Sequence, residues 1–367
     1  KPEGYITTMH DPLKRKTVME LIDFKERLFP IGRLDKNTSG AILLTNDGDL
    51  EIVFGTGGET INGHLYVAKL QDLINNDLSN AQSIMDGMGK GFIAPVSLAD
   101  MNGNSTLDIV AISFDGYLKV FDGSSYWEIH SHSFDDFETS AAPVIGSFTG
   151  NFLPDIVLSL YEGNNQSYSD YKQIMLDGYT GQLVKIDSFG AMQFSSGSAA
   201  DLNHDGFDEL IVSLVNSNGG IMSHSILAQD YIADSAYVLY TSSGQNLGSS
   251  PLVQDIDGND SLELIFAVGL DSLNPKGAQG FNLHCVELNS KVTSVGVAWG
   301  AYMGTENDGH YHFEGNICDT ISIASLGVSM ISCNGFDDGK MYFTPTGGQQ
   351  PYMYQFSNNV TDSLVYD

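Results

Sequence analysis

Short apolar runs recur along most of the chain, each next to a cluster of Asp, Asn, Ser and Gly. Examples are residues 109–111, 210–212 and 264–266. Runs of this length between turn residues predict β-strands, and residues 65–68 and 117–121 alternate apolar and polar positions as half-buried strands do. Asp-Gly pairs that predict hairpin turns stand at residues 115–116, 122–123 and 177–178. The pattern therefore predicts a mainly β chain.

A repeated spacing of oxygen-bearing residues precedes three of these strands. In residues 201–209, oxygen side chains occupy positions 1, 3, 5 and 9, and glycine occupies position 6. Ca²⁺ prefers about six to eight oxygen ligands on a flexible loop, so this spacing predicts Ca²⁺ binding. The candidate ligand residues are Asp201, Asn203, Asp205, Phe207 and Glu209; Asp255, Asp257, Asn259, Ser261 and Glu263; and Asp100, Asn102, Asn104 and Asp108.

A fourth loop, residues 147–155, keeps the register but lacks most of the acidic residues. The four loops start at residues 100, 147, 201 and 255, a repeat of 47 to 54 residues. A repeat of this length with several short strands predicts the blades of a β-propeller. We expect loop 201–209 to bind Ca²⁺ best, followed by loops 255–263 and 100–108, with loop 147–155 empty.

These repeats resemble the FG-GAP repeats of integrin-α-type propellers over about residues 46–316. The resemblance implies a Ca²⁺ ion in a hairpin turn that holds two strands together. It also implies a β-propeller of which this chain represents about five blades, within the range of about four to eight known for propellers.

A different motif lies near the start of the chain, in residues 28–48. Apolar residues flank a polar turn there, which predicts a strand, a loop and a second strand. Arg33 lies two residues before Asp35, and an adjacent cation keeps a carboxylate ionised and able to act as a nucleophile. The same pair taken alone is also typical of a structural ion pair.

The full string GRLD, KNTSG and TNDG is more specific, and it resembles the signature of ribosomal-RNA pseudouridine synthases. The resemblance implies that Asp35 is the nucleophile toward a uridine flipped out of the RNA and that Arg33 helps to hold the flipped state. Flipping is required because the reacting atoms are inaccessible in a stacked helix.

The resemblance to the synthases stops near residue 50. The family's His-Pro element and Lys-x-Tyr strand do not follow, and Tyr66 fits a propeller strand instead. Residues 46–50 fit both the synthase signature and the end of a metal loop, which suggests a join of two sequences there. We therefore expect residues 1–50 to be an α+β synthase fragment without activity of its own, followed by a propeller over residues 51–316.

The last part of the chain, residues 317–367, changes to alternating strands with glycine turns. It resembles an Ig-like repeat of gliding-type bacterial surface adhesins, which implies a partial β-sandwich module.

Charge separates the two main parts of the chain. All three arginines lie in the first 33 residues, and residues 1–50 contain eight basic and eight acidic residues. The net charge of −30 therefore belongs to residues 51–367, which should repel nucleic acid and attract divalent cations. No apolar run approaches the roughly 18 residues of a membrane span, so no membrane insertion is expected.

These observations predict two functions. The first is a secreted or cell-surface Ca²⁺-binding propeller for adhesion, with a protein or glycan ligand and no catalysis. The alternative is a cytoplasmic RNA pseudouridine synthase that isomerises uridine in ribosomal RNA with Asp35 as nucleophile. A polysaccharide-cleaving propeller is a third option, which would require a pair of carboxylates with separated pKa values in a cleft.

Overall fold

The computed structural model contains mostly short strands. The residues it describes are 2–7, 13–21, 29–31, 36–37, 43–45, 50–151, 153–164, 167–188, 195–246, 248–273, 280–292, 297, 299–306, 308–311, 322–329, 340–346, 354–355 and 361–362. Among these residues, no helix combines the length and apolar character needed to cross a membrane.

Strands between residues 51 and 291 form five antiparallel sheets, called sheets 1 to 5 in chain order. Sheet 1 contains β3 (Glu51–Gly55), β4 (His64–Lys69) and β5 (Gln82–Asp86), with helix α1 (Leu70–Ile74) after β4. Sheet 2 contains β6 (Ser97–Ala99), β7 (Asp108–Ile112), β8 (Tyr117–Phe121) and β9 (Glu128–Ser133). Sheet 3 contains β10 (Phe137–Glu138), β11 (Val144–Gly146), β12 (Asp155–Asn164), β13 (Ser167–Leu176) and β14 (Leu183–Ser188). Sheet 4 contains β15 (Ser198–Ala200), β16 (Glu209–Asn218), β17 (Ile221–Asp230) and β18 (Ser235–Ser243). Sheet 5 contains β19 (Leu252–Gln254), β20 (Ser261–Gly269) and β21 (Phe281–Lys291).

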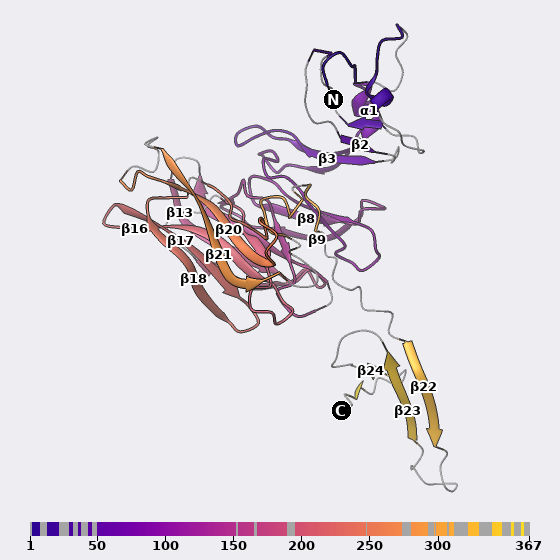
Figure 1. Ribbon diagram of the computed structural model, residues 1–367, viewed down its shortest axis with the longest axis vertical. Coiled ribbons are helices and arrows are strands. Elements are labelled where there is room, and N and C mark those ends of the chain that lie inside the picture. The colour runs from indigo at the N-terminus through magenta and orange to yellow at the C-terminus, as the bar shows by residue number, and fades with distance from the viewer. Residues whose placement is uncertain are drawn as a thin grey trace.

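The sheets pack face to face through apolar side chains, and Figure 1 shows the strands of sheets 4 and 5 lying next to one another. One core cluster joins sheets 2, 3 and 4 and includes Val110, Leu158 and Val212. A second cluster joins sheets 4 and 5 through Ile211 and Leu264. Burial of apolar surface is the main favourable term in folding. These contacts therefore stabilise the packing of each sheet on the next one along the chain.

One short strand of each of sheets 2 to 5 lies next to a short strand of the neighbouring sheet. Strand β6 contacts β11, β11 contacts β15, and β15 contacts β19. The residues of these strands are mostly buried, as expected for strands that lie between packed sheets. The mainly β prediction is confirmed, whereas closure into a propeller stays a prediction.

Residues 299–306 and 308–311, called the axial segment, lie across three of these short strands. The Ala199 amide donates to Trp299 O at 2.8 Å in sheet 4, and the Val253 amide donates to Gly300 O at 2.7 Å in sheet 5. In sheet 2 the Leu98 amide donates to Gly309 O at 2.6 Å. The axial segment therefore connects the last of the five sheets to the second.

Sheet 1 packs on sheet 2. Leu65, Val67 and Met85 share a core cluster with Ile109 and Phe121. The Phe92 amide also donates to Thr56 O at 2.9 Å, and the Phe114 amide donates to Gly91 O at 2.8 Å. Residues 51–92 are thus built into the row of sheets, and Tyr66 lies in β4 opposite Phe54.

The N-terminal part contains a 3-10 turn (Val18–Leu21) and two paired strands, β1 (Phe29–Ile31) and β2 (Leu43–Thr45). Their pairing is antiparallel, with Phe29 opposite Thr45, so the predicted strand, loop and strand are confirmed. In the C-terminal part, β22 (Ser322–Ser329) pairs with β23 (Lys340–Thr346), and β24 (Tyr354–Gln355) pairs with β25 (Thr361–Asp362). The Ig-like module stays a prediction.

Candidate functional site

Each of the four loops follows a short strand (β6, β11, β15 or β19) and leads into the next strand of the same sheet along the chain. In every loop the carboxylate at position 9 accepts the backbone N–H of position 2, which closes the loop. These bonds run from Met101 to Asp108 (2.9 Å), from Phe148 to Asp155 (2.9 Å), from Leu202 to Glu209 (2.6 Å) and from Ile256 to Glu263 (2.8 Å). The common closure shows that the four sequence repeats are also structural repeats.

The acidic residue at position 1 organises the first half of three loops. Asp201 accepts the N–H groups of Asp205 and Gly206, and Asp255 accepts those of Gly258, Asn259 and Asp260. Asp100 does the same in its own loop. Backbone N–H groups thus hold the carboxylate of position 1 inside its own loop.

Loop 255–263 brings three carboxylates together. Oxygen atoms of Asp255, Asp257 and Glu263 all lie within 4.8 Å of one another, and Glu263 is buried. Within the described residues none of the three has an ion-pair partner, so their mutual repulsion is not offset by a side chain. A hard divalent cation prefers such an oxygen set, and the donors therefore fit Ca²⁺. The other two predicted ligands, Asn259 and Ser261, are joined by a hydrogen bond from Ser261 N to Asn259 Oδ1 of 2.7 Å.

In loop 201–209 an amide lies among the carboxylates. Asn203 Nδ2 is 3.1 Å from Asp205 Oδ2, 2.6 Å from Glu209 Oε1 and 3.1 Å from Asp230 Oδ2. Rotation of the amide by half a turn exchanges Nδ2 for Oδ1, which would present an oxygen to a cation at the same place. Phe207, the remaining predicted ligand, offers only its backbone carbonyl.

Loop 100–108 shows the same arrangement. Asn102 Nδ2 lies 3.3 Å from Asp108 Oδ1, and both Asn102 Nδ2 and Asn104 Nδ2 donate to Asp122 Oδ2, at 3.1 and 2.9 Å. Asp122, which the sequence did not assign to the site, thus accepts hydrogen bonds from two of the predicted ligands of this loop.

Loop 147–155 is satisfied by its own hydrogen bonds. Thr149 Oγ1 donates to Asp155, and Asn151 Nδ2 donates to Thr149 Oγ1 at 2.8 Å and to Asp177 Oδ2 at 2.9 Å. The Asn151 amide thereby occupies the centre of a loop with a single carboxylate of its own. That this loop holds no cation stays a prediction.

Sequence reasoning missed a second acidic residue in each site. The strand registers place Glu287 opposite Glu263 and, continued by one residue, place Asp122, Asp177 and Asp230 opposite the position-9 carboxylates of sheets 2, 3 and 4. Like charges directly opposite on neighbouring strands are destabilising, and a bound cation would offset that repulsion. The available signal was the acidic residue that follows the apolar strand of each hairpin. In the pairs at residues 122–123 and 177–178 we interpreted it only as a turn residue, and Asp230 was not assigned.

Burial raises the pKa of several of these carboxyls. Burial raises the pKa of Glu209 to about 7, and the nearby charges of Asp230, Asp201 and Asp205 add to the effect. Burial also raises the pKa of Asp108 and of Asp155. Hydrogen bonds from Ser124 and Ser125, in contrast, hold the pKa of Asp122 well below its usual range. A cation at Glu209 would replace the proton and favour the ionised form.

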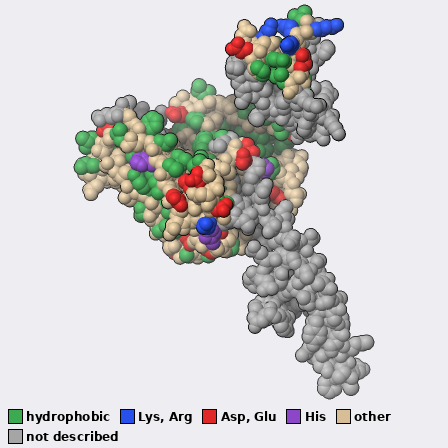
Figure 2. Space-filling view, viewed as in Figure 1, with side chains coloured by type: hydrophobic (Ala, Val, Ile, Leu, Met, Phe, Trp, Pro, Cys, Tyr) green, Lys and Arg blue, Asp and Glu red, His purple; other side chains and the backbone are tan. Residues whose placement is uncertain are grey.

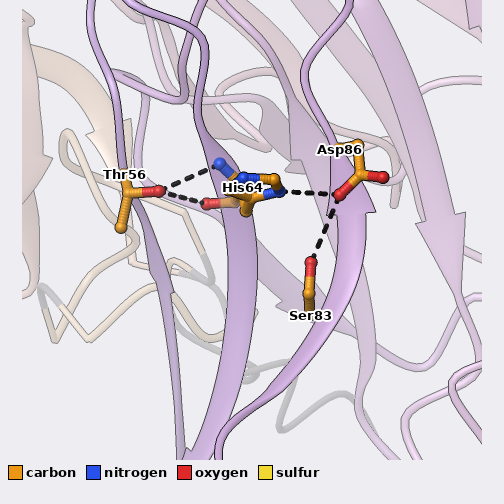
Figure 3. A network of polar contacts seen from close by, with 4 residues as sticks. All are labelled: Thr56, His64, Ser83 and Asp86. Atoms are coloured by element: carbon orange, nitrogen blue, oxygen red, sulfur yellow. Dashed lines mark hydrogen bonds and ion pairs between the residues drawn. The ribbon is translucent and has the colours of Figure 1, made fainter.

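A polar network in sheet 1 contains the residue types of a hydrolase triad, but in the wrong order (Figure 3). His64 Nδ1 lies 2.7 Å from Asp86 Oδ1, and Ser83 Oγ donates to the same Asp86 oxygen at 3.4 Å. In a triad the serine must contact the imidazole that removes its proton. Ser83 contacts the acid instead, and Thr56 Oγ1 binds the His64 backbone, so no nucleophile is activated here.

Two other histidine groups have structural roles. His130 and His132 lie on β9, where their Nε2 atoms are 3.2 and 2.5 Å from the carbonyl oxygens of Gly178 and Gly181 in sheet 3. Both histidines are half-buried on a strand, where they join sheet 2 to sheet 3. His224 contacts Ser213 Oγ at 2.8 Å, but both side chains are fully buried and inaccessible to a substrate.

The predicted catalytic residues Arg33 and Asp35 lie outside the described residues. The loop that carries them joins β1 to β2, and Lys36 within it accepts the Gly4 amide at 2.8 Å through its backbone oxygen. Three consecutive basic residues that precede β1 in the chain, Lys14, Arg15 and Lys16, are exposed. On the face drawn in Figure 2, basic side chains gather at the N-terminal end, whereas acidic side chains are spread over the sheets.

Comparison with known proteins identifies relatives of the N-terminal part. Residues 1–90 match the family model described as RNA pseudouridylate synthase. An RNA pseudouridine synthase of Rickettsia bellii is 37% identical over 120 residues, which is 32% of this chain and 50% of that protein. One from Rickettsia prowazekii is 58% identical over 50 residues, 14% of this chain and 21% of that protein. The dual-specificity RNA pseudouridine synthase RluF of Salmonella typhi is 35% identical over 91 residues, 25% of this chain and 29% of that protein.

The chain thus spans half or less of the length of these relatives. The shortest of the three matches, over 50 residues, has the highest identity. Among solved structures, a subtype N11 neuraminidase-like protein of A/flat-faced bat/Peru/033/2010 (H18N11) aligns with a TM-score of 0.33 and 9% identity, over 82% of this chain and 75% of that one. The N-terminal part of the chain is therefore similar to RNA pseudouridine synthases over residues 1–90. Of the two functions expected from the sequence, the comparisons favour the alternative, RNA modification.

Proposed function

We propose that the N-terminal segment supplies the catalytic loop of an RNA pseudouridine synthase, with Asp35 as the nucleophile and RNA as the substrate class. The observation that carries the proposal is the family match over residues 1–90. It is supported by the antiparallel pairing of β1 with β2 on either side of the loop and by the exposed cluster Lys14, Arg15 and Lys16, since phosphate contacts come mainly from basic side chains.

The packing of sheet 1 limits how much of a synthase this chain can form. Residues 51–92 are committed to a core with sheet 2, so they cannot also form the far wall of a substrate cleft. Base flipping and attack require a preorganised cleft around the nucleophile. We therefore infer that the loop acts only when the remainder of a synthase domain is present.

A graft tests this proposal. Residues 1–50 would replace the matched segment of the Rickettsia prowazekii relative, and release of tritium from 5-tritiated uridine in RNA would be measured. We expect the graft to release tritium and its Asp35→Ala variant to release none, because the reaction has no other nucleophile. Asp47→Asn in the same graft is the matched control and should stay active. A folded, RNA-binding graft without activity, or activity that survives Asp35→Ala, would contradict the proposal.

A second function is favoured by the loop geometry. We propose that the row of sheets is a Ca²⁺-binding module. Its role would be adhesion, through a protein or glycan ligand outside the cell. The observation behind it is the convergence of Asp255, Asp257 and Glu263 within 4.8 Å. Loops 201–209 and 100–108 would bind more weakly or only after their Asn amides rotate.

Calorimetric titration and thermal unfolding of the full chain test the second function. A ligand present at about a hundred times its Kd stabilises the folded state by about 2.7 kcal/mol, so Ca²⁺ should raise the Tm measurably. Asp257→Asn should remove one binding event, whereas Asp260→Asn in the same loop should not, because the Asp260 side chain lies outside the cluster. No Ca²⁺ binding by the full chain, or binding unchanged by Asp257→Asn, would refute this function.

A further inference from the structure

Neighbouring sheets of the row pack on one another through two different faces. In sheet 4, the face that meets sheet 5 carries Ile211, Ile226 and Ala228, each fully buried. We call this the forward face of a sheet. In sheet 5, the face that receives it carries Leu264 and Phe266 and is called the rear face. The junction between the two sheets is therefore a forward face packed on a rear face.

Sheet 5 has a forward face of its own, and this face is open. The strand registers relate its residues to those of sheet 4: Ile265 corresponds to Ile211, Cys285 to Ala228 and Leu283 to Ile226. Leu283 is 69% exposed, whereas its counterpart in sheet 4 is fully buried. Phe281, two residues earlier and on the same face, is 63% exposed, and Cys285 is exposed as well. Large apolar side chains gathered on an exposed face are typical of a contact surface.

At the other end of the row, sheet 1 has an apolar rear face. Ile52 and Phe54 flank Val53, which packs in the core shared with sheet 2, so they point to the opposite side of β3. Tyr66 lies opposite Phe54, and the two rings stack with their centroids 5.7 Å apart. Ile52, Phe54 and Tyr66 belong to none of the core clusters of the described residues. They are half-buried, like Ile265 on the open face of sheet 5.

We propose that the forward face of sheet 5 binds the rear face of sheet 1 in a second copy of this chain. Sheet 1 of the same chain leaves Leu283 and Phe281 exposed, so the partner comes from another molecule. The contact repeats the junction between sheets 4 and 5, an interface that the fold already contains. Aliphatic and aromatic side chains then meet on both sides, as they do in the centre of protein interfaces.

The two faces differ, so the copies associate head to tail. Contacts of this kind give a ring where the rotation between copies closes and a filament where it does not. The contact needs neither RNA nor Ca²⁺, and it is therefore independent of both functions proposed above.

Sedimentation of the full chain over a range of concentrations tests the association. In about 0.15 M salt the Debye length is about 8 Å, which screens the repulsion between acidic copies. We expect the wild type to associate and Leu283→Lys to associate about tenfold more weakly or worse, because it places a charge in an apolar contact. Leu183→Lys is the matched control, since Leu183 is 46% exposed on β14 of sheet 3, and it should associate as the wild type does.

Cross-linking identifies the two faces. One chain keeps Cys285 and has serine in place of the other two cysteines, and a second chain combines Ile52→Cys with replacement of all three native cysteines by serine. A short bismaleimide should join these two chains in a mixture and should join neither chain to itself. Val184→Cys, at an exposed position of β14, takes the place of Ile52→Cys in the control, which should give no mixed product.

Three results would each overturn the proposal. The first is a wild type that stays monomeric over the whole concentration range. The second is association that Leu283→Lys leaves unchanged. The third is linkage of Cys285 to Cys285 of another copy in place of the mixed product, which would show that two forward faces pack on each other.

Discussion

His224 is a titratable side chain whose surroundings, rather than a charged partner, decide its protonation. It lies on β17 between sheets 4 and 5, with its ring 5.5 Å from that of Phe266. Phe266 in turn stacks on His284 at 5.2 Å and contacts Tyr240 at 4.7 Å. Burial lowers the pKa of His224 to about 4, and the neighbouring His284 adds to the effect. In the described residues its Nδ1 atom has no hydrogen-bond partner.

Acid should therefore destabilise the protein through His224. The unfolded chain takes up a proton near pH 6.5 and the folded chain only near pH 4, so the stability due to the neutral imidazole is complete above pH 6.5 and is lost as the pH falls toward 4. We expect His224→Gln to reduce the loss between pH 7.5 and 5 by about 1 to 2 kcal/mol in urea unfolding. His64→Gln, at a half-buried histidine of sheet 1, is the control; equal acid sensitivity of wild type and His224→Gln would contradict the prediction.

Single residues also show where sequence reasoning reached its limit. The oxygen spacing of Asp255, Asp257 and Glu263 is visible in the sequence, because all three lie in one short loop whose shape follows from its own residues. Asp122 and Asp230 are not visible as site residues, since they reach the loops only through the pairing of the second and third strands. Register is a property of two strands and is set by which faces become buried.

At the scale of elements, loops 100–108 and 147–155 are in close contact with the hairpin turns of their own sheets. A Cβ added to Gly123 would lie 1.7 Å from Leu107 O, and one added to Gly178 would lie 1.8 Å from Pro154 O. Leu107 and Pro154 both occupy position 8 of their loops. The Asp-Gly pairs were predicted as turns, but glycine is required here because the backbone of the loop approaches it.

Gly178→Ala should therefore disturb the loop of sheet 3 as well as the turn. Overpacking of a filled site costs about 1 to 3 kcal/mol, and here the clash is with backbone that cannot rotate away. Gly58→Ala is the matched control, because an added Cβ there meets nothing within 4 Å. Thermal unfolding of the two variants measures the difference, and an equal Tm for both would show that the turn can move away from the loop.

At the scale of the whole molecule, the axial segment ties together sheets that are distant in sequence. Trp299 is fully buried, while Trp127, the other tryptophan of the chain, is 78% exposed. The strands and loops of residues 51–291 could be predicted from local patterns. The path of residues 299–311 could not, because this segment has no regular alternation and is defined by the strand edges that it covers.

Trp299→Ala should destabilise the row of sheets strongly. Truncation of a buried tryptophan costs about 3 to 5 kcal/mol through lost burial and the cavity that is left. Trp127→Ala, in contrast, should change the free energy of unfolding by about 0.5 kcal/mol or less, as surface substitutions usually do. Guanidinium unfolding followed by circular dichroism compares them, and similar midpoints for the two variants would mean that the axial segment is not part of the core.

The position of the axial segment in the chain also sets an order of events during synthesis. Leu98 of sheet 2 emerges from the ribosome long before Gly309 and Tyr311, the residues that pair with it. Until those residues emerge, the edges of β6, β15 and β19 are open to other strands, and unpaired edges are where nascent chains associate wrongly. Chains that stop before residue 299 should therefore aggregate or remain bound to chaperones. Chains released after residue 311 can pair these strand edges with their own axial segment.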